Sequence, residues 1–448
     1  MKQLIILKKC RLFIVGALLT VLVCSFAVGS RAVGSATNLP VNTVRPPERL
    51  TLREAATLAL ARNPSLLAHG YELQAAAARQ LQVGLRPNPT LSLELEDVLG
   101  SGPVSGTENA QTTLLLSQLF ELGGKRAART EVAQAMLSQK RSVAELARVE
   151  VLAAVAERFV HVVGDQLEVK LAREGTQLSE EVLTLAQRRV EAGRASPIEE
   201  KRARILLARA RISEEHAEHE LLVSSRQLTA LWGATNAAFT EADADLFVRP
   251  AVPAFDELAA RINRSPELAR WAGEKSVRDA EVKLADARRR PDITAGAGVR
   301  QFSGPDDVGF VFQFSLPLQF SDRQQGARAE ARALRDKADL DFAGTELRLR
   351  TALYGIAQEL LHADTELDAL EREMLPDAEA MLKLAREGVE RAGFSQLELL
   401  DVQRTLLELR RERIEAAVAY HQFVIEIEKL LGEPLSPASA QSPKTSQP

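Results

Sequence analysis

Two stretches of the chain alternate apolar and polar residues, although most of the chain has helical patterns. Residues 308–318 (VGFVFQFSLPL) place Val308, Phe310, Phe312, Phe314 and Leu316 on one side of an extended chain, and Val311, Gln313 and Ser315 on the other. Residues 292–302 alternate in the same way, with Ile293 and Val299 on the apolar side. The turn sequence SGPDD separates the two stretches, so we predict a β-hairpin.

A second hairpin is predicted about two hundred residues earlier. Leu91, Leu93 and Leu95 alternate with Ser92, Glu94 and Glu96, a Gly/Ser/Pro loop follows at 100–109, and residues 111–120 return with a less regular pattern. Each strand is near the roughly 9 to 11 residues that cross a bilayer when tilted. Four strands cannot close a membrane barrel, which starts at about eight. We therefore expect oligomerisation, and three copies rather than two, because eight strands leave no open lumen.

The remaining patterns are helical and long. Thr51 is expected to cap a short helix that ends at Arg62, and Pro64 to open another that runs to about Arg86. No proline occurs from Lys125 to Glu191, and a helix of that length would extend roughly 100 Å at 1.5 Å per residue. After a break at 193–197, a helix of about 35 residues is predicted to return to Trp232.

The same plan then recurs. Pro64 and Pro266 are 202 residues apart, and Glu199 and Glu398 are 199 apart, as two tandem copies would produce. The predicted organisation is a signal peptide (1–32), an extended leader (33–50), a first repeat (51–235), a linker (236–254), a second repeat (255–432) and a disordered tail (433–448). Each repeat comprises a short helix, a medium helix, a hairpin, a long helix and a medium helix.

The second copy differs from the first in its long helix. That helix is predicted from Arg323 to about Arg391, and Pro376 should kink it. A final helix from about Gln396 to Leu431 carries two adjoining heptad positions, which is typical of a coiled coil. They are Leu400, Leu407 and Ile414, then Ala417, Val424 and Leu431, with Gln403 and Arg410 as misses.

The first thirty residues indicate export. Lysines and Arg11 precede an apolar run at 12–28, and small residues follow, which is the pattern of a cleaved signal peptide. A short transmembrane anchor is the alternative interpretation. Cys10 and Cys24 both lie in this segment, so the mature chain would have no thiol. Lipidation of Cys24 is disfavoured because Val23 precedes it, where lipidated precursors carry a small residue.

Composition narrows the class of protein. Removing residues 1–32 takes away five basic and no acidic side chains, which leaves 52 against 61 and a net charge of −9, so no nucleic-acid partner is expected. Aromatic residues make up only 4%. Neither the nucleotide-binding motif G-x-x-x-x-G-K-[ST], nor H-E-x-x-H, nor G-x-S-x-G occurs. We expect a protein without enzymatic activity or cofactor.

Together, the two repeats resemble the TolC-like outer-membrane efflux protein family. The resemblance implies a mainly α fold with a small β part: a long coiled-coil α-helical barrel plus four transmembrane β-strands per protomer, which close a 12-stranded barrel as a trimer. It implies location in the outer membrane of a Gram-negative bacterium, with a long periplasmic extension. A periplasmic adaptor (membrane-fusion) protein and an inner-membrane proton-driven pump of the resistance-nodulation-division (RND) type are the implied partners.

The sequence ELGGKR at 121–126 resembles the signature of the heavy-metal branch, the outer component of cobalt-zinc-cadmium efflux systems, although the second copy has SDRQ at 321–324. This implies a passive exit duct for heavy-metal cations. A duct for drugs or secreted polypeptides is the nearer alternative, and a periplasmic coiled-coil scaffold is the more distant one.

The strongest candidate site lies at the start of the last helix. Glu398 and Asp401 share a helix face and match the two positions where TolC-like channels carry acidic rings at the periplasmic entrance, so they are candidates for a gate that selects cations. The competing interpretation of Glu398 is a capping box with Ser395, as Ser196 and Glu199 form in the other copy. Arg404 is a candidate ion-pair partner of Asp401.

The turn at 121–126 has a structural interpretation that we favour over a role in metal choice. Gly123 and Gly124 are expected at positive φ where a strand becomes a helix. Lys125, Arg126 and Arg323 would then anchor lipid headgroups at the inner rim.

Further roles follow from the resemblance or from the strand pattern. The resemblance implies periplasmic docking tips at Gly193, Ser196, Pro197, Gly393 and Ser395. Residues expected to face a barrel lumen are Glu94, Glu96, Arg300 and Gln313. Those expected to face lipid are Leu91, Leu93, Leu95, Ile293, Val299, Phe310, Phe312 and Phe314, with a small soluble sandwich core as the alternative. His216 and His219 lie one turn apart, but a solvated helix face is favoured over a metal site there.

Overall fold

A computed structural model describes residues 48–304, 307–390 and 396–435. The predicted signal peptide, with Cys24, lies outside the described residues, as do most of the leader and the tail from 436. Gly393 and Ser395, which were assigned to the docking tips, also lie outside them.

The first two helices begin where their capping residues predict. Helix α2 (Leu52–Arg62) starts with a capping box, in which the Glu54 N–H donates to Thr51 Oγ1 and the Thr51 N–H donates to Glu54 Oε2 at 2.9 Å. Asn63 ends α2 and caps α3 (Pro64–Val83), because its Oδ1 accepts from the Ser65 N–H at 2.9 Å. Both predicted helices are confirmed, and α3 ends three residues before Arg86.

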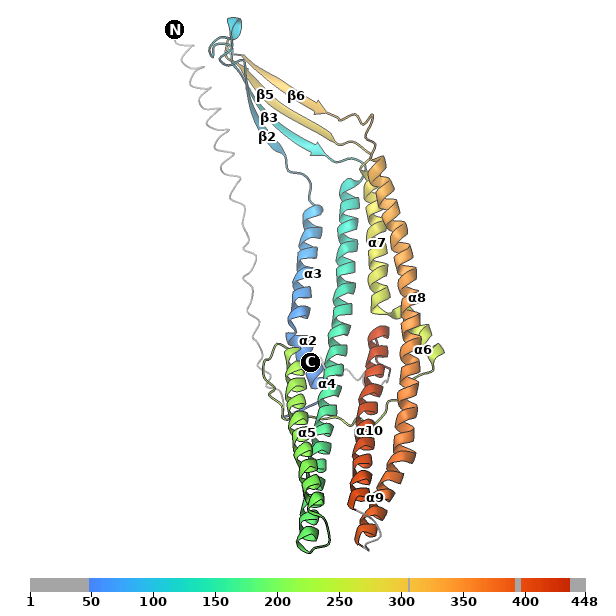
Figure 1. The fold of residues 1–448 in the computed structure, drawn as a ribbon. Helices are drawn as coiled ribbons and strands as arrows, with labels where there is room; N and C mark the ends of the chain where they lie inside the picture. The colour runs from blue at the N-terminus through green and yellow to red at the C-terminus, as the bar shows by residue number, and fades with distance from the viewer. Residues whose placement is uncertain (1–47, 305–306, 391–395, 436–448) are drawn as a thin grey trace, which may run out of the picture. The chain divides into compact units, whose positions relative to one another are not determined.

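Long helices form most of the fold (Figure 1). Helix α4 runs from Lys125 to Glu191, the 67 residues that the absence of proline predicts. The other helices are α5 (Pro197–Ala230), α6 (Phe255–Arg261), α7 (Pro266–Ala287), α8 (Gln325–Ala369), α9 (Leu375–Glu390) and α10 (Gln396–Leu431), with short 3₁₀ turns at Gly102–Val104 and Ile262–Arg264. Helices α4 and α5 pack together, and α10 contacts α4, α8 and α9.

The predicted kink has a defined form. Between α8 and α9 the chain makes a π-helical turn at Leu370–Met374, directly before Pro376. Proline has no N–H to donate and its ring crowds the carbonyl of Arg372, four residues earlier. Because a π turn shifts the hydrogen-bond register by one residue, it is one of the recognised ways for a helix to accommodate such a defect.

Both predicted hairpins form, and they join into one antiparallel sheet. Its strands are β2 (Thr90–Glu96), β3 (Gln111–Phe120), β5 (Ile293–Phe302) and β6 (Asp307–Ser315), in the order β2-β3-β5-β6. Strands β3 and β5, from different hairpins, pair along ten residues with Leu114 opposite Val299. Strands β2 and β6 are therefore the edges of the sheet (Figure 1).

The order of elements in the first copy recurs in the second. Helices α2, α3, α4 and α5, with β2 and β3, correspond to α6, α7, the α8–α9 pair and α10, with β5 and β6. Four of the described helices therefore connect directly with the sheet: α3 and α7 lead into it, and α4 and α8 lead out of it.

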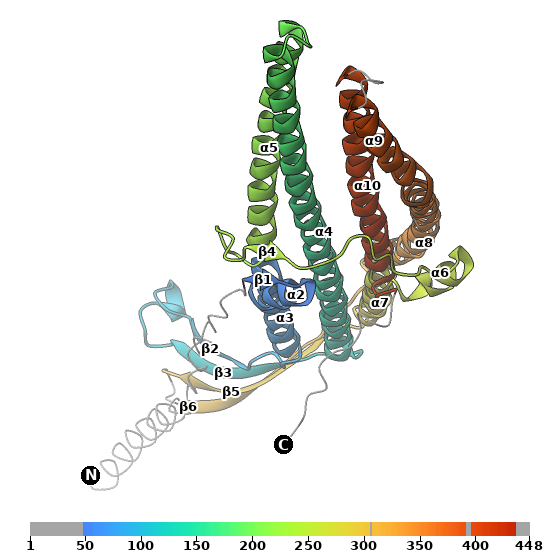
Figure 2. The same ribbon diagram turned by 90° about the horizontal axis from the view of Figure 1, so that it is seen from below.

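The segment predicted as a linker is fixed to the helices on both sides. Strand β4 (Glu241–Ala242) pairs in parallel with β1 (Arg49–Leu50), a pairing that the sequence did not predict. The Ala242 N–H donates to Gln166 Oε1 of α4 at 3.1 Å, and Tyr420 of α10 donates to the Pro250 carbonyl at 2.8 Å. Arg249 binds Asp368 of α8 at 2.8 Å. The segment therefore ties the α4–α5 pair to α8 and α10 (Figure 2).

One hydrophobic core lies where these helices meet the connecting segment. Its fully buried side chains include Val155, Phe159 and Val162 of α4, Leu228 of α5, Leu258 of α6, Leu353 and Leu367 of α8, and Ile427 and Leu431 of α10. Among the described residues, no helix has an apolar stretch long enough to cross a bilayer.

One of the two predicted heptad positions of α10 is buried, and the other is partly displaced. Ala417, Val424 and Leu431 are buried, as are Ile414 and the polar Gln403. Leu400 and Leu407 instead line a groove, and their neighbours Leu399 and Leu406 are buried. The reason is that α10 packs against α8 and α9 on one side and against α4 on another, so more than one stripe of residues is covered.

Candidate functional site

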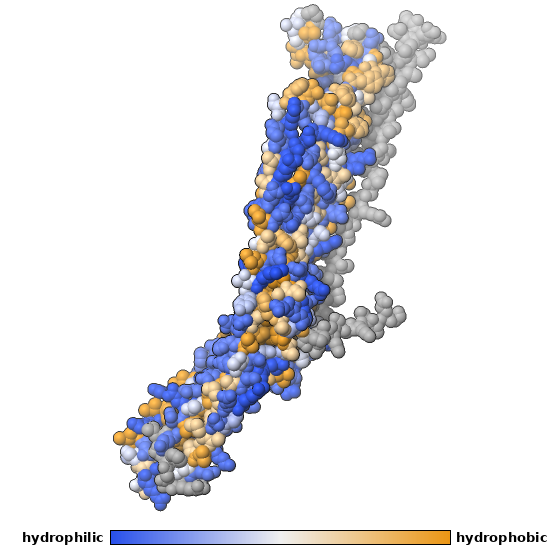
Figure 3. All heavy atoms as spheres, turned by 90° about the vertical axis from the view of Figure 1, so that its right-hand side faces the viewer, coloured by the Kyte–Doolittle hydropathy of each residue, from blue (hydrophilic) through white to orange (hydrophobic). Residues whose placement is uncertain are grey.

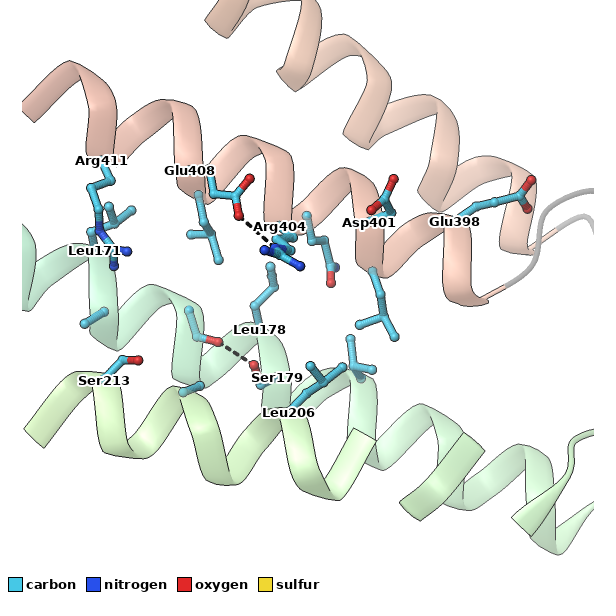
Figure 4. Close-up of a pocket in the computed structure, with 17 residues that line it drawn as sticks. Leu171, Leu178, Ser179, Leu206, Ser213, Glu398, Asp401, Arg404, Glu408 and Arg411 are labelled. Atoms are coloured by element: carbon cyan, nitrogen blue, oxygen red, sulfur yellow. Dashed lines mark hydrogen bonds and ion pairs between the residues drawn. The ribbon is translucent and has the colours of Figure 1, made fainter. Parts of the chain in front are cut away.

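The predicted acidic pair lies on one wall of a groove between α10 and the α4–α5 pair (Figure 4). Glu398 and Asp401 are both exposed, and with Arg404 they form the charged wall that α10 contributes. The groove has a volume of about 640 Å³. The structure thus places the two acidic residues together, on one side of an open space.

The opposite wall of the groove is largely apolar. It consists of Leu171, Ala172, Gly175, Leu178 and Val182 from α4, with Leu206 and Ala210 from α5. The small residues let the helices approach, and Ser179 donates to the Gly175 carbonyl within its own helix at 2.8 Å. Charge in this groove therefore comes almost entirely from α10.

Arg404 does not pair with Asp401 as expected. Its Nε lies 2.7 Å from Glu408 Oε1, one turn further along α10, and the hydrogen bond with Glu408 raises the pKa of Arg404. Both acids are within helical reach of the arginine, at three and four residues, so the sequence does not decide between them. In the structure, Arg404 is hydrogen-bonded to Glu408, and Asp401 contributes only a weaker attraction.

The capping interpretation can be checked in one of the two copies. Ser196 caps α5, because its Oγ accepts from the Ile198 N–H at 3.3 Å, and Pro197 occupies the first helical position. The expected capping box with Glu199 is not formed, since the Glu199 N–H donates to the Ser196 backbone carbonyl at 2.9 Å. Ser395, the corresponding residue before α10, lies outside the described residues. Glu398 at the gate therefore stays a prediction.

A second groove follows further along the same helices, and it contains partly buried carboxylates. Asp165 and Glu168 of α4 face it, and burial raises the pKa of both. Glu168 Oε2 lies 3.3 Å from Arg411 Nε of α10. The other titratable groups that line this groove are His161 of α4, His216 and Glu220 of α5, and Glu415 of α10.

His216 and His219 are both exposed on α5, and His216 Nε2 lies 4.0 Å from Glu220 Oε1. Across the described ranges, no three His, Cys, Asp or Glu side chains are grouped so that they could hold a metal ion. The solvated helix face that the sequence favoured agrees with this placement.

The register of the sheet brings the predicted apolar residues onto one face. One row across the strands is Leu93, Leu114, Val299 and Phe310, and the next is Leu91, Leu116, Ala297 and Phe312. Phe310 and Phe312 are each 81% exposed, so this face is unburied in the single chain. Leu114 and Leu116 were not among the predicted residues because the pattern of β3 is irregular. Hydrophobic residues gather near the sheet end in the view of Figure 3.

The opposite face carries the residues predicted to line a lumen. Glu94 and Arg300 share one row across the strands, through Thr113. The Arg300 guanidinium donates to Thr113 Oγ1 at 2.9 Å and lies 3.0 Å from Glu96 Oε2. Gln313 lies on this face too, opposite Gly296. The sheet therefore has one apolar face and one polar face.

The turn between β3 and α4 has the predicted backbone but a different role for its lysine. Gly123 and Gly124 both have positive φ, at 77° and 75°. Lys125 is buried, and its Nζ lies 2.7 Å from Asp292 Oδ1 at the start of β5. The expectation that Lys125 anchors lipid headgroups is therefore wrong, because Asp292 from the second copy neutralises it inside the protein.

The described docking-tip residues connect α4 to α5. Gly193 has a φ of 72° and its N–H donates to the Val190 carbonyl at 2.9 Å, which closes the end of α4. Ser196 and Pro197 then start α5. This connection is a tight turn between two long antiparallel helices.

A four-stranded sheet with one exposed apolar face, joined at one end to paired long helices, defines the protomer of a TolC-like outer-membrane channel. The chain belongs to the outer membrane efflux protein family, whose model matches residues 55–234 and 259–433. The resemblance inferred from the sequence is thereby confirmed. The protein is an outer-membrane efflux channel with long periplasmic helices.

Relatives and solved structures agree with this assignment. The cobalt-zinc-cadmium resistance protein CzcC of Cupriavidus metallidurans is 30% identical over 423 residues, which cover 94% of this chain and 99% of the relative. The nickel and cobalt resistance protein CnrC of the same species is 28% identical over 327 residues, 72% of this chain and 77% of the relative.

Among solved structures, CusC matches with a TM-score of 0.72 at 16% identity, covering 85% of this chain and 92% of the other. VceC from Vibrio cholerae matches with a TM-score of 0.69 at 17% identity, covering 86% and 97%. At these identities the likeness shows the fold, which is the predicted one.

Proposed function

We propose that the protein is the outer-membrane exit duct of a tripartite efflux system for heavy-metal cations. The duct is passive, and a periplasmic adaptor and an inner-membrane proton-driven RND pump supply the coupling. The observation that carries the metal assignment is the match to a cobalt-zinc-cadmium resistance protein along nearly the whole of both chains. The acidic face of α10 supports it, because carboxylates at a constriction concentrate cations.

The duct requires more than one copy of the chain, and the sheet supports three. Its edge strands β2 and β6 have no neighbour on their outer sides within the described residues. Unpaired edge groups cannot be left in hydrocarbon, because each costs several kcal/mol. Pairing β6 of one copy with β2 of the next would close a barrel, and three copies supply twelve strands with an open lumen.

The helices carry matching unpartnered surfaces. On α5, Ile198, Ile205 and Ile212 recur every seven residues, and on α8 the same spacing joins Leu340, Leu347, Tyr354 and Leu361. Each of these seven side chains is more than half exposed in the single chain. Apolar residues at heptad spacing are the seams of coiled coils. Such seams support packing of α5 from one copy against α8 of the next.

In a trimer, Glu398 and Asp401 would place six carboxylates around the axis of the duct. The turn at Gly193, Ser196 and Pro197 and the one containing Gly393 and Ser395 would form the tips that contact the adaptor. Opening of the gate on docking follows from this arrangement, because the acidic residues lie within two turns of one tip.

Single-channel recording in planar bilayers tests the gate. The double substitution Glu398→Ala with Asp401→Ala should lower the cation-to-anion permeability ratio, because the ring loses its negative charge. Glu199→Ala is the matched control, since Glu199 in the first repeat occupies the position that Glu398 has in the second repeat. Unchanged selectivity in correctly assembled channels would remove the gate assignment and leave the duct intact.

Growth assays test the cargo. A deletion strain should become sensitive to at least one of zinc, cobalt and cadmium, and the cloned gene should restore resistance. Sensitivity to antibiotics alone would favour the duct for drugs. A protein that washes from membranes in carbonate would instead be a periplasmic scaffold, because a barrel resists that treatment.

A further inference from the structure

Exposed arginines gather at the four connections between helices and strands. Arg86 lies between α3 and β2, Arg126 in the first turn of α4, residues 288–290 between α7 and β5, and Arg323 between β6 and α8. We call these six residues the arginine band: Arg86, Arg126, Arg288, Arg289, Arg290 and Arg323. All six are exposed.

Four acidic groups at this level have partners outside the arginine band. Asp292 accepts from Lys125, Glu121 is paired with Arg129, Asp286 is paired with Arg328, and Asp322 accepts from the Gln324 N–H at 2.8 Å. Within the part of the chain that the structure describes, no carboxylate lies within ion-pair distance of any member of the arginine band. The chain as a whole is acidic, so this is a local excess of positive charge.

Contacts between the two repeats of one chain hold the connections after α7, before α4 and before α8 close to one another. Lys125 at the start of α4 binds Asp292 at the start of β5, and Arg328 near the start of α8 binds Asp286 near the end of α7. Gly123 lies against the Arg290 side chain so closely that an added Cβ would be 2.8 Å from Arg290 Cδ. The arginine band therefore lies where the helices end and the sheet with its exposed apolar face begins.

The helix dipole does not explain all of these residues. A cation near a helix C-terminus is favourable, which accounts for Arg86 after α3 and Arg288 after α7. Arg126 and Arg323 lie at the N-termini of α4 and α8, where the dipole disfavours a cation. At these two positions a bound anion would offset the unfavourable interaction with the helix dipole.

We infer that the arginine band binds the phosphate groups of anionic glycerophospholipids in the membrane leaflet on the helix side. This inference rests on the proposed function, because it places the apolar face of the sheet in a bilayer. A guanidinium can donate two parallel hydrogen bonds to a phosphate, and it does so best at the edge of the hydrocarbon, where water is scarce. The sequence predicted Lys125 as a headgroup anchor, but its ammonium group is buried. The exposed arginines of the band take this role instead.

The number of anionic lipids that the protein retains tests the arginine band directly. The full-length protein is reconstituted in vesicles of equal phosphatidylglycerol and phosphatidylcholine at about 0.15 M salt, extracted gently, and its bound lipids are counted by native mass spectrometry. Wild-type protein should retain phosphatidylglycerol in clear excess. Arg288→Gln, Arg289→Gln and Arg290→Gln together should reduce that excess, by up to about fivefold for each arginine removed.

A second triple variant controls for overall charge. Arg202→Gln, Arg209→Gln and Arg226→Gln remove the same charge from exposed positions on α5 and should leave the excess unchanged. Equal retention of the two lipids by wild-type protein, or equal loss in both triple variants, would overturn the inference. Displacement of the lipid by 10 mM inorganic phosphate would also overturn it, because it would indicate a site for free phosphate.

The two proposals fail in different ways. If wild-type protein resists carbonate extraction and conducts ions but shows no preference for phosphatidylglycerol, only the lipid inference fails. If it neither inserts nor conducts in any vesicle, the duct fails and the lipid inference with it.

Discussion

Both long helices that leave the sheet begin at a residue in the left-handed region. Before α4 this residue is Gly124, with φ of 75°, and before α8 it is Gln324, with φ of 58°. The sequence motif with two glycines predicted such a backbone only in the first copy. A side chain in this region costs about 1 to 2 kcal/mol, so the second copy carries strain that the first avoids.

Gln324→Gly should therefore stabilise the protein. We expect the free energy of unfolding to rise by up to about 1 kcal/mol, since the relief of strain exceeds the entropy that glycine adds to the unfolded chain. Thermal denaturation in detergent, followed by circular dichroism, measures the change. Gly124→Ala is the reciprocal variant and should destabilise by a similar amount. A destabilised Gln324→Gly variant would mean that the side-chain hydrogen bonds from Gln324 Nε2 to Asp322 outweigh the strain.

Sequence reasoning at the residue scale succeeded for local pairs and failed for distant ones. The Thr51 cap involves Glu54, three residues away, and was predictable from spacing alone. Lys125 is neutralised by Asp292, which lies 167 residues further along the chain. No rule based on sequence spacing predicts that contact, because Lys125 and Asp292 come together only when β3 and β5 pair.

At the scale of elements, the contact between α4 and α10 should depend on pH. Burial raises the pKa of Asp165 and of Glu168, so the folded state holds protons that the unfolded state has released. Stability then falls as pH rises above the ordinary carboxyl pKa, because the folded state binds more protons than the unfolded state.

Asp165→Asn with Glu168→Gln should flatten this dependence. The wild-type melting temperature should fall as pH rises from about 5 to about 7.5, and the double variant should lose part of that fall. Glu145→Gln with Glu150→Gln, at exposed positions of the same helix, provides the control. An identical pH profile for wild type and the Asp165 and Glu168 variant would contradict the assignment to these two groups.

The π turn before α9 gives a second prediction for an element. Pro376→Ala restores an N–H donor and removes the ring, so the turn at 370–374 should revert to α-helix. Hydrogen–deuterium exchange should slow there, corresponding to local opening that is costlier by about 1 to 3 kcal/mol. Asp377→Ala keeps the proline and should leave exchange unchanged. Unaltered exchange in the Pro376→Ala variant would show that neighbouring contacts, not proline, maintain the turn.

Helices and strands with clear start and stop signals were predictable. Very short strands, and a helix that packs against neighbours on two sides, were not. Helix α4 has no proline inside it and glycines at both ends, so its bounds followed from sequence. The β1–β4 pair has only two residues per strand and no periodicity to detect. The α10 seam was predicted only in part, because the burial of Gln403, and of Leu399 and Leu406 in place of Leu400 and Leu407, depends on neighbours that the apolar pattern does not contain.

At the scale of the whole molecule, the same substitution at two adjacent residues on opposite faces of the sheet should have different effects on assembly. Phe312→Arg places a charge on the apolar face and should reduce assembly in the membrane, because such a residue costs about 2 to 4 kcal/mol at mid-bilayer. Gln313→Arg, on the polar face, should assemble normally. The amount of protein that resists carbonate extraction measures both. Equal losses in the two variants would contradict the assignment of the faces.

The repeat offsets predicted two copies of one plan, and the alternating strands predicted the two hairpins. They did not predict that β3 and β5 would join these hairpins, because pairing between distant strands depends on the fold as a whole. In the proposed trimer, the strands that close the barrel lie in other copies of the chain. A single chain points to its partners only through the unpaired edge strands β2 and β6 and the exposed apolar seams of α5 and α8.

The central claim is that each chain supplies one third of a membrane duct, and the mass of the purified assembly tests it most directly. Native mass spectrometry of the full-length protein, released from detergent micelles, should give a complex of three copies. The same preparation should conduct ions in planar bilayers. A single copy that stays soluble and folded without detergent would contradict the account.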